Sequence, residues 1–190
     1  MTLLSRDDIA RALSMLASEL NARGVSANIQ IVGGAALALR HFDRSATRDI
    51  DSSIRFADAA VFHEAALRVA NRLGWDGEWI NDEAAKYIPR VGEAVHWETI
   101  HEHDGVLIQV ASAESLLAMK LLANRPGRDD RDIAELMAIC DLSTVAELEE
   151  LFERFYPGDG LSDRAIAIVE RIRSVGIPNK PSPPPFPALP

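Results

Sequence analysis

The stretch Asn28-Ile29-Gln30-Ile31-Val32-Gly33-Gly34 opens the most informative part of the chain, and Thr47-Arg48-Asp49-Ile50-Asp51 closes it. The first five residues alternate polar and apolar side chains, which predicts a short strand. The strand runs into the Gly-Gly turn, a helix is expected over 35–42, and a polar turn leads to a second strand over 48–56, with Ile50, Ile54 and Phe56 on one side. This order predicts a strand–helix–strand unit of an α/β fold.

The composition is that of a soluble globular protein, with 47 % hydrophobic and 26 % charged residues among 190. Twenty Lys and Arg oppose 29 Asp and Glu, which gives a net charge of −9. Since affinity for phosphate comes from neutralising cations, this charge excludes binding of nucleic acid through bulk charge. Any contact with nucleic acid must therefore use a local basic patch.

Cysteine usage and hydropathy indicate a cytoplasmic protein. Cys140 is the only cysteine, which excludes an intrachain disulfide and a cysteine-rich zinc site. The first residues lack a basic segment followed by an apolar stretch, so we expect no signal peptide. No uncharged apolar run approaches the roughly 20 residues that span a bilayer, so no membrane partner is expected.

The remaining elements follow from caps and periodicity. Ser5 is expected to cap a first helix that ends near Gly24, and Asp58 to cap another that Gly74 closes. Two antiparallel strands are expected over 95–100 and 106–111, joined near Asp104-Gly105. From residue 112 on the pattern is helical, with helices expected at about 113–123, 131–140, 145–155 and 163–175. We therefore expect an α/β (α+β) core over 1–111, a helical subdomain over 112–176 and a proline-rich tail over 177–190.

The glycine turn and the acidic pair together indicate a nucleotide site. Gly33 and Gly34 allow the backbone to approach a ligand, and the N–H groups at a helix start attract phosphate oxygens. Asp49 and Asp51, at alternate strand positions, would point the same way with Cα atoms roughly 7 Å apart. Two close carboxylates favour a divalent cation between them, and Mg²⁺ prefers one or two carboxylates together with substrate phosphates. Each feature taken singly is also compatible with a purely structural role.

Lys120 lies in a helix that is apolar on nearly every side. A buried ammonium needs a carboxylate or a phosphate partner, and the alternative is that the side chain reaches water from one exposed stripe. The functional interpretation is that Lys120 contacts the triphosphate, and that Asp132, at the start of the next helix, faces the same cleft.

The pattern Gly33-Gly34-Ala35 followed by Thr47-Arg48-Asp49-Ile50-Asp51 resembles the nucleotidyltransferases of the polymerase-beta superfamily. Within it, the chain is most similar to the toxins of the AbiEii and MenT type. Two further stretches add to the resemblance, 116–123 with its lysine and 128–133 with its Arg/Asp-rich sequence. Together these matches touch most of residues 29–136.

The resemblance implies a mixed sheet flanked by helices, followed by the helical subdomain. It also implies transfer of a nucleotide from an NTP to the 3′ end of tRNA, by the toxin of a toxin–antitoxin pair whose partner is an antitoxin protein. The residues it implies fall into two groups. Asp49, Asp51, Lys120 and Asp132 would be catalytic, with Mg²⁺ or Mn²⁺ on the first two; Gly33, Gly34, Thr47, Arg48 and Lys120 would bind the nucleotide.

One position departs from the superfamily pattern. A third carboxylate is usual on a later strand, and the best-placed position holds Gln109. A neutral amide cannot be a general base and is a weak ligand for Mg²⁺. Either Asp132 or Asp129 supplies the charge, or the chain is inert and acts as a binding module or an antitoxin. Another alternative keeps the chemistry but makes the acceptor a small molecule or a protein hydroxyl.

Two arginine groups could hold RNA locally. They are Arg40 with Arg44 on the helix after Gly34, and Arg125 with Arg128 and Arg131 after the lysine helix. The alternative is that they are surface arginines paired with neighbouring aspartates. The acidic stretch 141–163 would repel RNA and would face away from it or meet a basic partner. Thr47 adds a possible regulatory phosphosite, since a phosphate there would repel nucleotide.

Two further features are a group of histidines and the proline-rich tail. His96, His101 and His103 with neighbouring glutamates have the spacing of a possible zinc site, although a solvated hairpin face is favoured. The tail holds seven of the ten prolines, so it is expected to form no hydrogen-bonded element. Such a segment could mediate self-association or dock on a partner.

Overall fold

The computed structural model describes residues 3–55 and 58–187 and divides the chain into two compact units. The sheet unit comprises 1–85, 97–111 and 183–190, and the helical unit comprises 86–96 and 112–182. The expected division between 111 and 112 coincides with one boundary of these units. Residues 86–96, in contrast, group with the helices, and the tail is divided between the two units. Phe56, expected on the second strand, lies outside the described residues.

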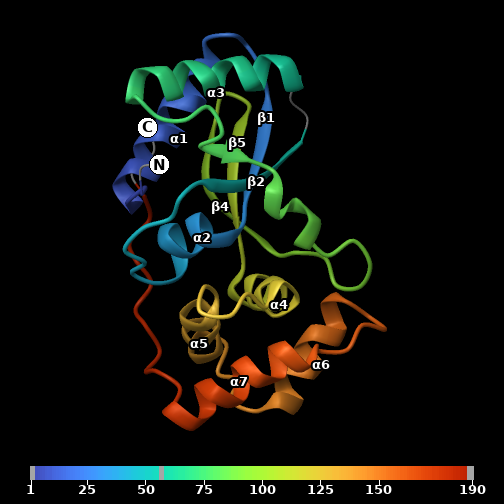
Figure 1. The fold of residues 1–190 in the computed structure, drawn as a ribbon. Helices are drawn as coiled ribbons and strands as arrows, with labels where there is room; N and C mark the ends of the chain where they lie inside the picture. The colour runs from blue at the N-terminus through green and yellow to red at the C-terminus, as the bar shows by residue number, and fades with distance from the viewer. Residues whose placement is uncertain (1–2, 56–57, 188–190) are drawn as a thin grey trace. The chain divides into compact units, whose positions relative to one another are not determined.

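The sheet unit is built on a mixed five-stranded sheet in the order β3-β2-β1-β5-β4 (Figure 1). The central strand β1 (Ala27–Ile31) is antiparallel to β2 (Ile50–Arg55) and parallel to β5 (Val106–Ala111). At the edges, β3 (Ile80–Asn81) is parallel to β2, and β4 (Trp97–His103) is antiparallel to β5. This arrangement confirms the expected mixed sheet with flanking helices, and the turn between β4 and β5 has positive φ at Asp104 and Gly105, 45° and 80°.

Two helices whose ends are marked by capping residues in the sequence pack in the core of the sheet unit. A capping box between Ser5 and Asp8 starts α1 (Arg6–Asn21), and the Asp58 side chain caps α3 (Ala59–Leu73), which Gly74 ends with φ 69°. The two helices contact each other, and α1 also contacts β5. Their apolar faces and the strand residues Ile29 and Ile108 are fully buried, so one continuous core fixes the sheet.

The helix after the glycine turn differs from its expectation. It starts at Gly33 as α2 (Gly33–Ala36), continues as a π-helix η1 (Leu37–His41), and stops where Phe42 becomes extended. Arg40 therefore lies on η1, whereas Arg44 lies in the loop beyond it. The expectation that these two arginines share one helix was wrong, because the backbone becomes extended at Phe42, before Arg44.

The helical unit consists mainly of α4 (Ala113–Ala123), α5 (Asp130–Ile139), α6 (Val145–Phe155) and α7 (Asp163–Val175). Helix α4 contacts α5 and α6, and α7 contacts the same two helices. Ser112, Thr144 and Ser162 cap three of the helices, and Thr144 forms the expected capping box with Glu147. The four helices agree with the expected ones to within one residue at each end.

Residues 82–96 connect β3 to β4, and they begin with a 3-10 helix, η2 (Glu83–Tyr87). In the helical unit, Arg154 holds the following segment with two contacts. Its carbonyl accepts from the Glu93 N–H at 2.7 Å, and its Nε lies 2.7 Å from the Glu93 carboxylate. Tyr156, which follows α6, donates a hydrogen bond from its hydroxyl to the Tyr87 carbonyl. Residues at the end of α6 therefore hold this segment in place.

The described part of the tail has neither helix nor strand, as expected. Lys180 pairs with Asp141 at 2.7 Å within the helical unit. In the sheet unit, Arg6 donates to the Pro185 carbonyl, and the Arg40 guanidinium lies 4.5 Å from the centroid of the Phe186 ring. The tail therefore docks on its own chain.

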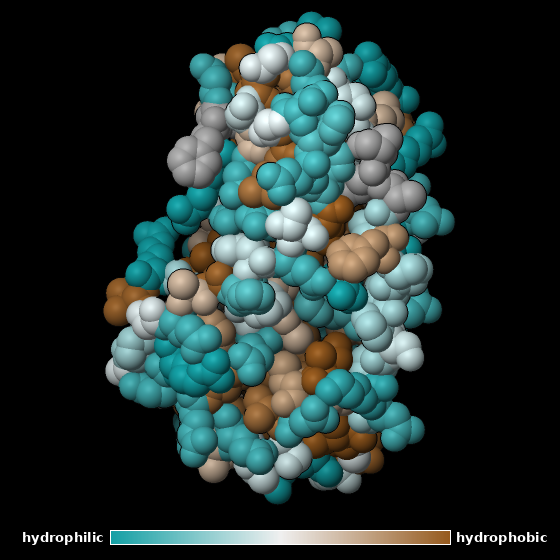
Figure 2. All heavy atoms as spheres, turned by 180° about the vertical axis from the view of Figure 1, so that it is seen from behind, coloured by the Kyte–Doolittle hydropathy of each residue, from teal (hydrophilic) through white to brown (hydrophobic). Residues whose placement is uncertain are grey.

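On the face that Figure 2 draws, hydrophilic residues cover most of the surface and hydrophobic ones show between them in small groups. Among the described residues, no helix combines the length and the apolar character needed to cross a bilayer.

Candidate functional site

The glycine turn is crowded by side chains that the sequence had singled out. Gly33 has φ 65°, and a Cβ there would lie 2.5 Å from Oδ2 of Asp51. A Cβ on Gly34 would lie 2.7 Å from the Thr47 hydroxyl oxygen and 3.2 Å from Cζ of Arg44. Gly33 therefore requires glycine because of its positive φ, and a side chain at Gly34 would have to displace the Thr47 hydroxyl and the Arg44 guanidinium.

Thr47 anchors the entry to β2. Its backbone exchanges two hydrogen bonds with Leu4, at 2.7 and 2.9 Å, and its side chain is almost wholly buried. The hydroxyl group is held against Gly34, which suits the predicted contact with a nucleotide. A kinase would need this bridge to Leu4 to open first, so phosphorylation of Thr47 is expected only when the N-terminal segment is displaced.

Asp49 and Asp51 do not both lie on the strand, because β2 begins at Ile50. The N–H of Ile50 donates to the Trp79 carbonyl at 2.7 Å, and the carbonyl of Asp51 accepts from Val32 at 2.9 Å. Asp51 therefore follows the alternation of the strand and reaches the glycine turn. Asp49 precedes the strand and lines a pocket. The alternation of side chains along β2 therefore does not determine where the Asp49 carboxylate points. Both residues are half-buried.

A row of polar side chains crosses the sheet two residues from Asp51. Gln30 is level with Ser53 on β2 and with Gln109 on β5, and Gln109 is level with Thr99 on β4. The Gln30 amide donates to Gln109 at 3.4 Å, and the Gln109 amide donates to Thr99 at 3.3 Å. The amide at the expected position of the third carboxylate is thus hydrogen-bonded to its neighbours in the sheet.

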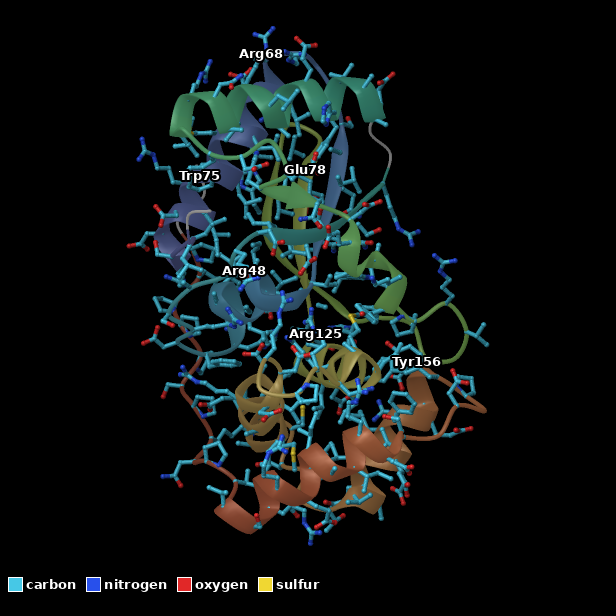
Figure 3. The ribbon with its side chains drawn as sticks, in the orientation of Figure 1. Arg48, Arg68, Trp75, Glu78, Arg125 and Tyr156 are labelled. Carbon is cyan, nitrogen blue, oxygen red and sulfur yellow. The ribbon has the colours of Figure 1, made fainter. Side chains whose placement is uncertain are left out.

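The pocket beside Asp49 has a volume of about 590 Å³ and belongs to the sheet unit. Its walls are formed by residues before β2 and around β3: Leu4, Arg48, Asp49, Gly74, Trp75, Asp76, Glu78, Trp79, Asn81 and Glu83. Arg48, Trp75 and Glu78 are labelled in Figure 3 and come from the segments that precede β2 and β3. The buried Trp79 indole fixes this segment by donating to the Ala66 carbonyl at 3.0 Å.

Sequence reasoning missed this pocket except for Arg48 and Asp49. The segment from Trp75 to Glu83 has no periodicity, and its shape depends on Trp79 packing under α3. The available signal in this segment was two tryptophans close to four acidic residues, which by itself does not predict a cavity.

Lys120 is the centre of a buried ion-pair cluster in the helical unit. Its Nζ lies 2.7 Å from Asp129 and 2.8 Å from Asp132, and the three side chains are at most 8 % exposed. Arg125 adds two guanidinium bonds to Asp129, at 2.8 and 3.0 Å, and a backbone N–H at 3.1 Å. Two carboxylates therefore meet the need of the buried ammonium for an acidic partner, and the alternative of a lysine that reaches water is wrong. The expected contact between Lys120 and a triphosphate stays a prediction.

The charge of Asp129 is set by this cluster. Burial acts to raise the pKa of its carboxyl group, but hydrogen bonds and attraction from Arg125 and Lys120 outweigh burial, so the pKa is lowered. Asp129 therefore stays ionised and holds Lys120 together with Asp132. Two of the three N–H donors of Lys120 are used in this way.

The candidate RNA-binding arginines are partly engaged. Arg40 pairs with Glu98 at 2.6 Å, and Arg44 donates to the Ala46 carbonyl. Arg125, labelled in Figure 3, is held by Asp129. Arg128 and Arg131 are exposed in the helical unit, where Arg131 lies 3.9 Å from Glu135. These two are the most accessible arginines of the predicted set.

The histidines do not form a metal centre. Within 3–55 and 58–187, no three or more His, Cys, Asp or Glu side chains are placed to hold a metal ion. His101 is 92 % buried while His103 is exposed beside Asp104, so the favoured solvated face describes only part of the hairpin. Burial, helped by the nearby His103, lowers the pKa of His101.

No protein-family model, no curated protein and no solved structure matches this chain. The functional argument therefore depends on the residues described above and on their geometry.

Proposed function

We propose that the protein is a Mg²⁺-dependent nucleotidyltransferase that moves a nucleotide from an NTP to the 3′ end of tRNA, as the toxin of a toxin–antitoxin system. The observation that carries the proposal is the contact between the glycine turn and the carboxylate of Asp51, with the Thr47 hydroxyl beside it. A backbone that only glycine permits is thus adjacent to a carboxylate, which suits phosphates held close to a divalent cation.

The donor set fits Mg²⁺ that arrives with its nucleotide. Asp49 and Asp51 offer two carboxylates, and the described residues contain no larger group for a metal. Mg²⁺ commonly binds through one or two carboxylates together with substrate phosphates, so a more complete protein cage is not required. When bound, the ion would neutralise phosphate charge and favour ionisation of the attacking hydroxyl.

The chain's own residues would divide the remaining work. Gly33 and Gly34 would let the phosphates approach the backbone, and Thr47 would donate its hydroxyl to a phosphate oxygen. Arg48, which is exposed, would attract the polyphosphate. The acceptor hydroxyl would attack the α-phosphate, and the bond to the β-phosphate would break with release of pyrophosphate. Gln109 cannot take the proton of this hydroxyl because an amide is not basic, so the proton would pass to an aspartate or to water.

The catalytic roles predicted for Lys120 and Asp132 remain a proposal. Both are already satisfied by an internal ion pair, and the geometry by itself explains why a lysine is needed in this helix. A role in the reaction would use the third N–H donor of Lys120.

A small-molecule acceptor is the second candidate, and the acidic pocket next to Asp49 favours it. Four carboxylates line this pocket against one guanidinium, which disfavours an RNA chain there. A protein acceptor or an inert binding module, including an antitoxin, would give different results in the test below.

The test is label transfer from each of the four NTPs to purified tRNA in the presence of Mg²⁺, with wild type, Asp51→Asn and Asp49→Asn. We expect transfer by wild type and a loss of at least about 100-fold in both variants, as for removal of a group that acts in the transition state. Asp104→Asn is the matched control, since it removes an exposed turn carboxylate and should leave transfer unchanged. Undiminished transfer by Asp51→Asn would refute the proposed site.

Two further readouts separate the alternatives. Growth should stop when wild type is expressed, but not when Asp51→Asn is expressed, if the protein is a toxin. Labelling of metabolites or of partner proteins without labelling of tRNA would identify the other acceptor classes. Calorimetry that detects no binding of Mg²⁺-NTP would identify an inert module.

A further inference from the structure

The pocket of the sheet unit has walls of two kinds. One part is apolar, with the half-buried Trp75 ring edge-on to the buried Trp79 at a centroid distance of 5.8 Å, and Leu4 beside them. The other part is polar and consists of carboxylates with Asn81 and Arg48. A cavity of about 590 Å³ with an aromatic wall and a few polar groups is typical of sites for small molecules.

The charges in this pocket are not balanced. Asp49, Asp76, Glu78 and Glu83 oppose Arg48 alone, so the lining carries a net charge of minus three. Within the part of the chain that the structure describes, Asp49, Glu78 and Glu83 make no ion pair. The Asp76 carboxylate accepts the N–H of Glu78 at 3.0 Å and has no ion-pair partner among these residues, so its charge is not compensated.

The distribution of these carboxylates points to an extended ligand. Since the described residues hold no group of three or more carboxylates placed for one metal ion, the negative charges are spread around the pocket. Several separated positive charges on one molecule would complement them better than a single ion. An indole face also attracts ammonium groups, more strongly for tryptophan than for other aromatic residues.

We propose that this pocket binds a small organic polycation, a molecule that carries two or three protonated amines on an aliphatic body. The carboxylates of Asp49, Glu78 and Glu83 contact the ammonium groups, and the Trp75 ring covers the aliphatic part. The binding itself does not depend on nucleotide transfer. If the proposed function also holds, the ligand lies beside Asp49, one of the two carboxylates proposed to hold Mg²⁺.

The test uses spermidine as the probe and titrates it into the full-length protein by calorimetry, without nucleotide or Mg²⁺. We expect saturable binding of one equivalent, with a change in tryptophan fluorescence. The double variant Glu78→Gln/Glu83→Gln should bind about 5- to 10-fold more weakly, as expected for the loss of two partly exposed charge pairs. Trp75→Leu should bind about 3-fold more weakly through loss of the cation–π contact.

The matched control is Glu149→Gln/Glu150→Gln, which removes two exposed carboxylates from α6 in the helical unit. This variant should bind spermidine within about 2-fold of wild type, and thermal unfolding should verify that each variant is folded. Equal weakening by both double variants would show that spermidine only screens the overall negative charge, and would overturn the proposal. Absence of saturable binding would overturn it as well.

The two proposals can fail separately. Binding of spermidine by Asp51→Asn, which should lack nucleotide transfer, would support the pocket even if the enzyme proposal fails. Transfer to tRNA by a protein that does not bind spermidine would support the enzyme and refute the pocket.

Discussion

The buried charged cluster of the helical unit and the acidic pocket of the sheet unit differ in whether their charges are paired. In the helical unit, the buried Lys120 is matched by Asp129 and Asp132, and Arg125 completes the cluster. In the sheet unit, the carboxylates around Asp49 stay in contact with solvent and lack ion-pair partners among the described residues. The first arrangement satisfies its charges within the protein, whereas the second leaves its charges to solvent or to the ligand proposed above.

Desolvation explains this difference. A charge removed from water must find its partner within the protein, because an isolated buried ion costs several kcal/mol. A charge at the wall of an open pocket keeps its water and needs no partner for folding. Unmatched charges are therefore tolerated where water reaches them, and in an open pocket they stay accessible to a ligand.

The largest effect is expected from Lys120→Met. The substitution leaves two buried aspartates without their ammonium and should lower the free energy of unfolding by about 3–5 kcal/mol. Lys180→Met is the matched control, because its pair with Asp141 is exposed and should contribute about 0–1 kcal/mol. Urea unfolding of both variants measures the difference. A Lys120→Met protein as stable as wild type would show that the cluster is not a structural requirement.

Gly33→Ala should have the next largest effect. Alanine at a φ of 65° costs roughly 1–2 kcal/mol, and its Cβ would also displace the carboxylate of Asp51. Gly24→Ala has the same φ and meets nothing within 4 Å, so it isolates the backbone cost. Chemical denaturation should find Gly33→Ala the less stable of the two. Equal losses would mean that the contact with Asp51 is without consequence.

The two units should also differ in their response to acid. Burial lowers the pKa of His41, opposed by its hydrogen bond to the Ala111 carbonyl, and lowers that of His101. The unfolded chain then binds more protons, so stability falls as the pH drops below about 6.5. The lowered pKa of Asp129 acts only at lower pH, below about 4.

Unfolding followed between pH 7.5 and 5 tests the histidine effect. His101→Asn and His41→Asn should each flatten the pH dependence over this range, since they remove a titrating group. Asp129→Asn should leave the slope above pH 5 unchanged. A slope that survives replacement of both histidines would assign the effect to other groups.

The smallest effect on stability is expected from Glu78→Gln/Glu83→Gln. Removing like charges that have no ion-pair partner among the described residues should change the free energy of unfolding by no more than about 0.5 kcal/mol. Thermal unfolding at low salt measures this change. A loss of several kcal/mol would show that these carboxylates support the fold, and would weaken their assignment to a ligand site.

Local signals in the sequence were sufficient for most elements. Ser5 with Asp8, Asp58 with Gly74, and Thr144 with Glu147 satisfy helix ends by contacts within a few residues, and the structure confirms each of these helices. The hairpin turn at Asp104-Gly105 was equally readable, because its two residues accept positive φ.

Other features depended on contacts between distant residues. Strand β2 begins at Ile50, whose N–H donates to the distant Trp79 carbonyl, and η1 stops where the backbone of the buried Phe42 becomes extended. The sequence alone therefore determined most of the helices and strands, although not β3 or η2, and it singled out Gly33, Asp51 and Lys120 as candidate site residues. The tertiary structure decided their partners and formed the pocket, because pairing and burial depend on chain segments that are far apart in the sequence and meet only on folding.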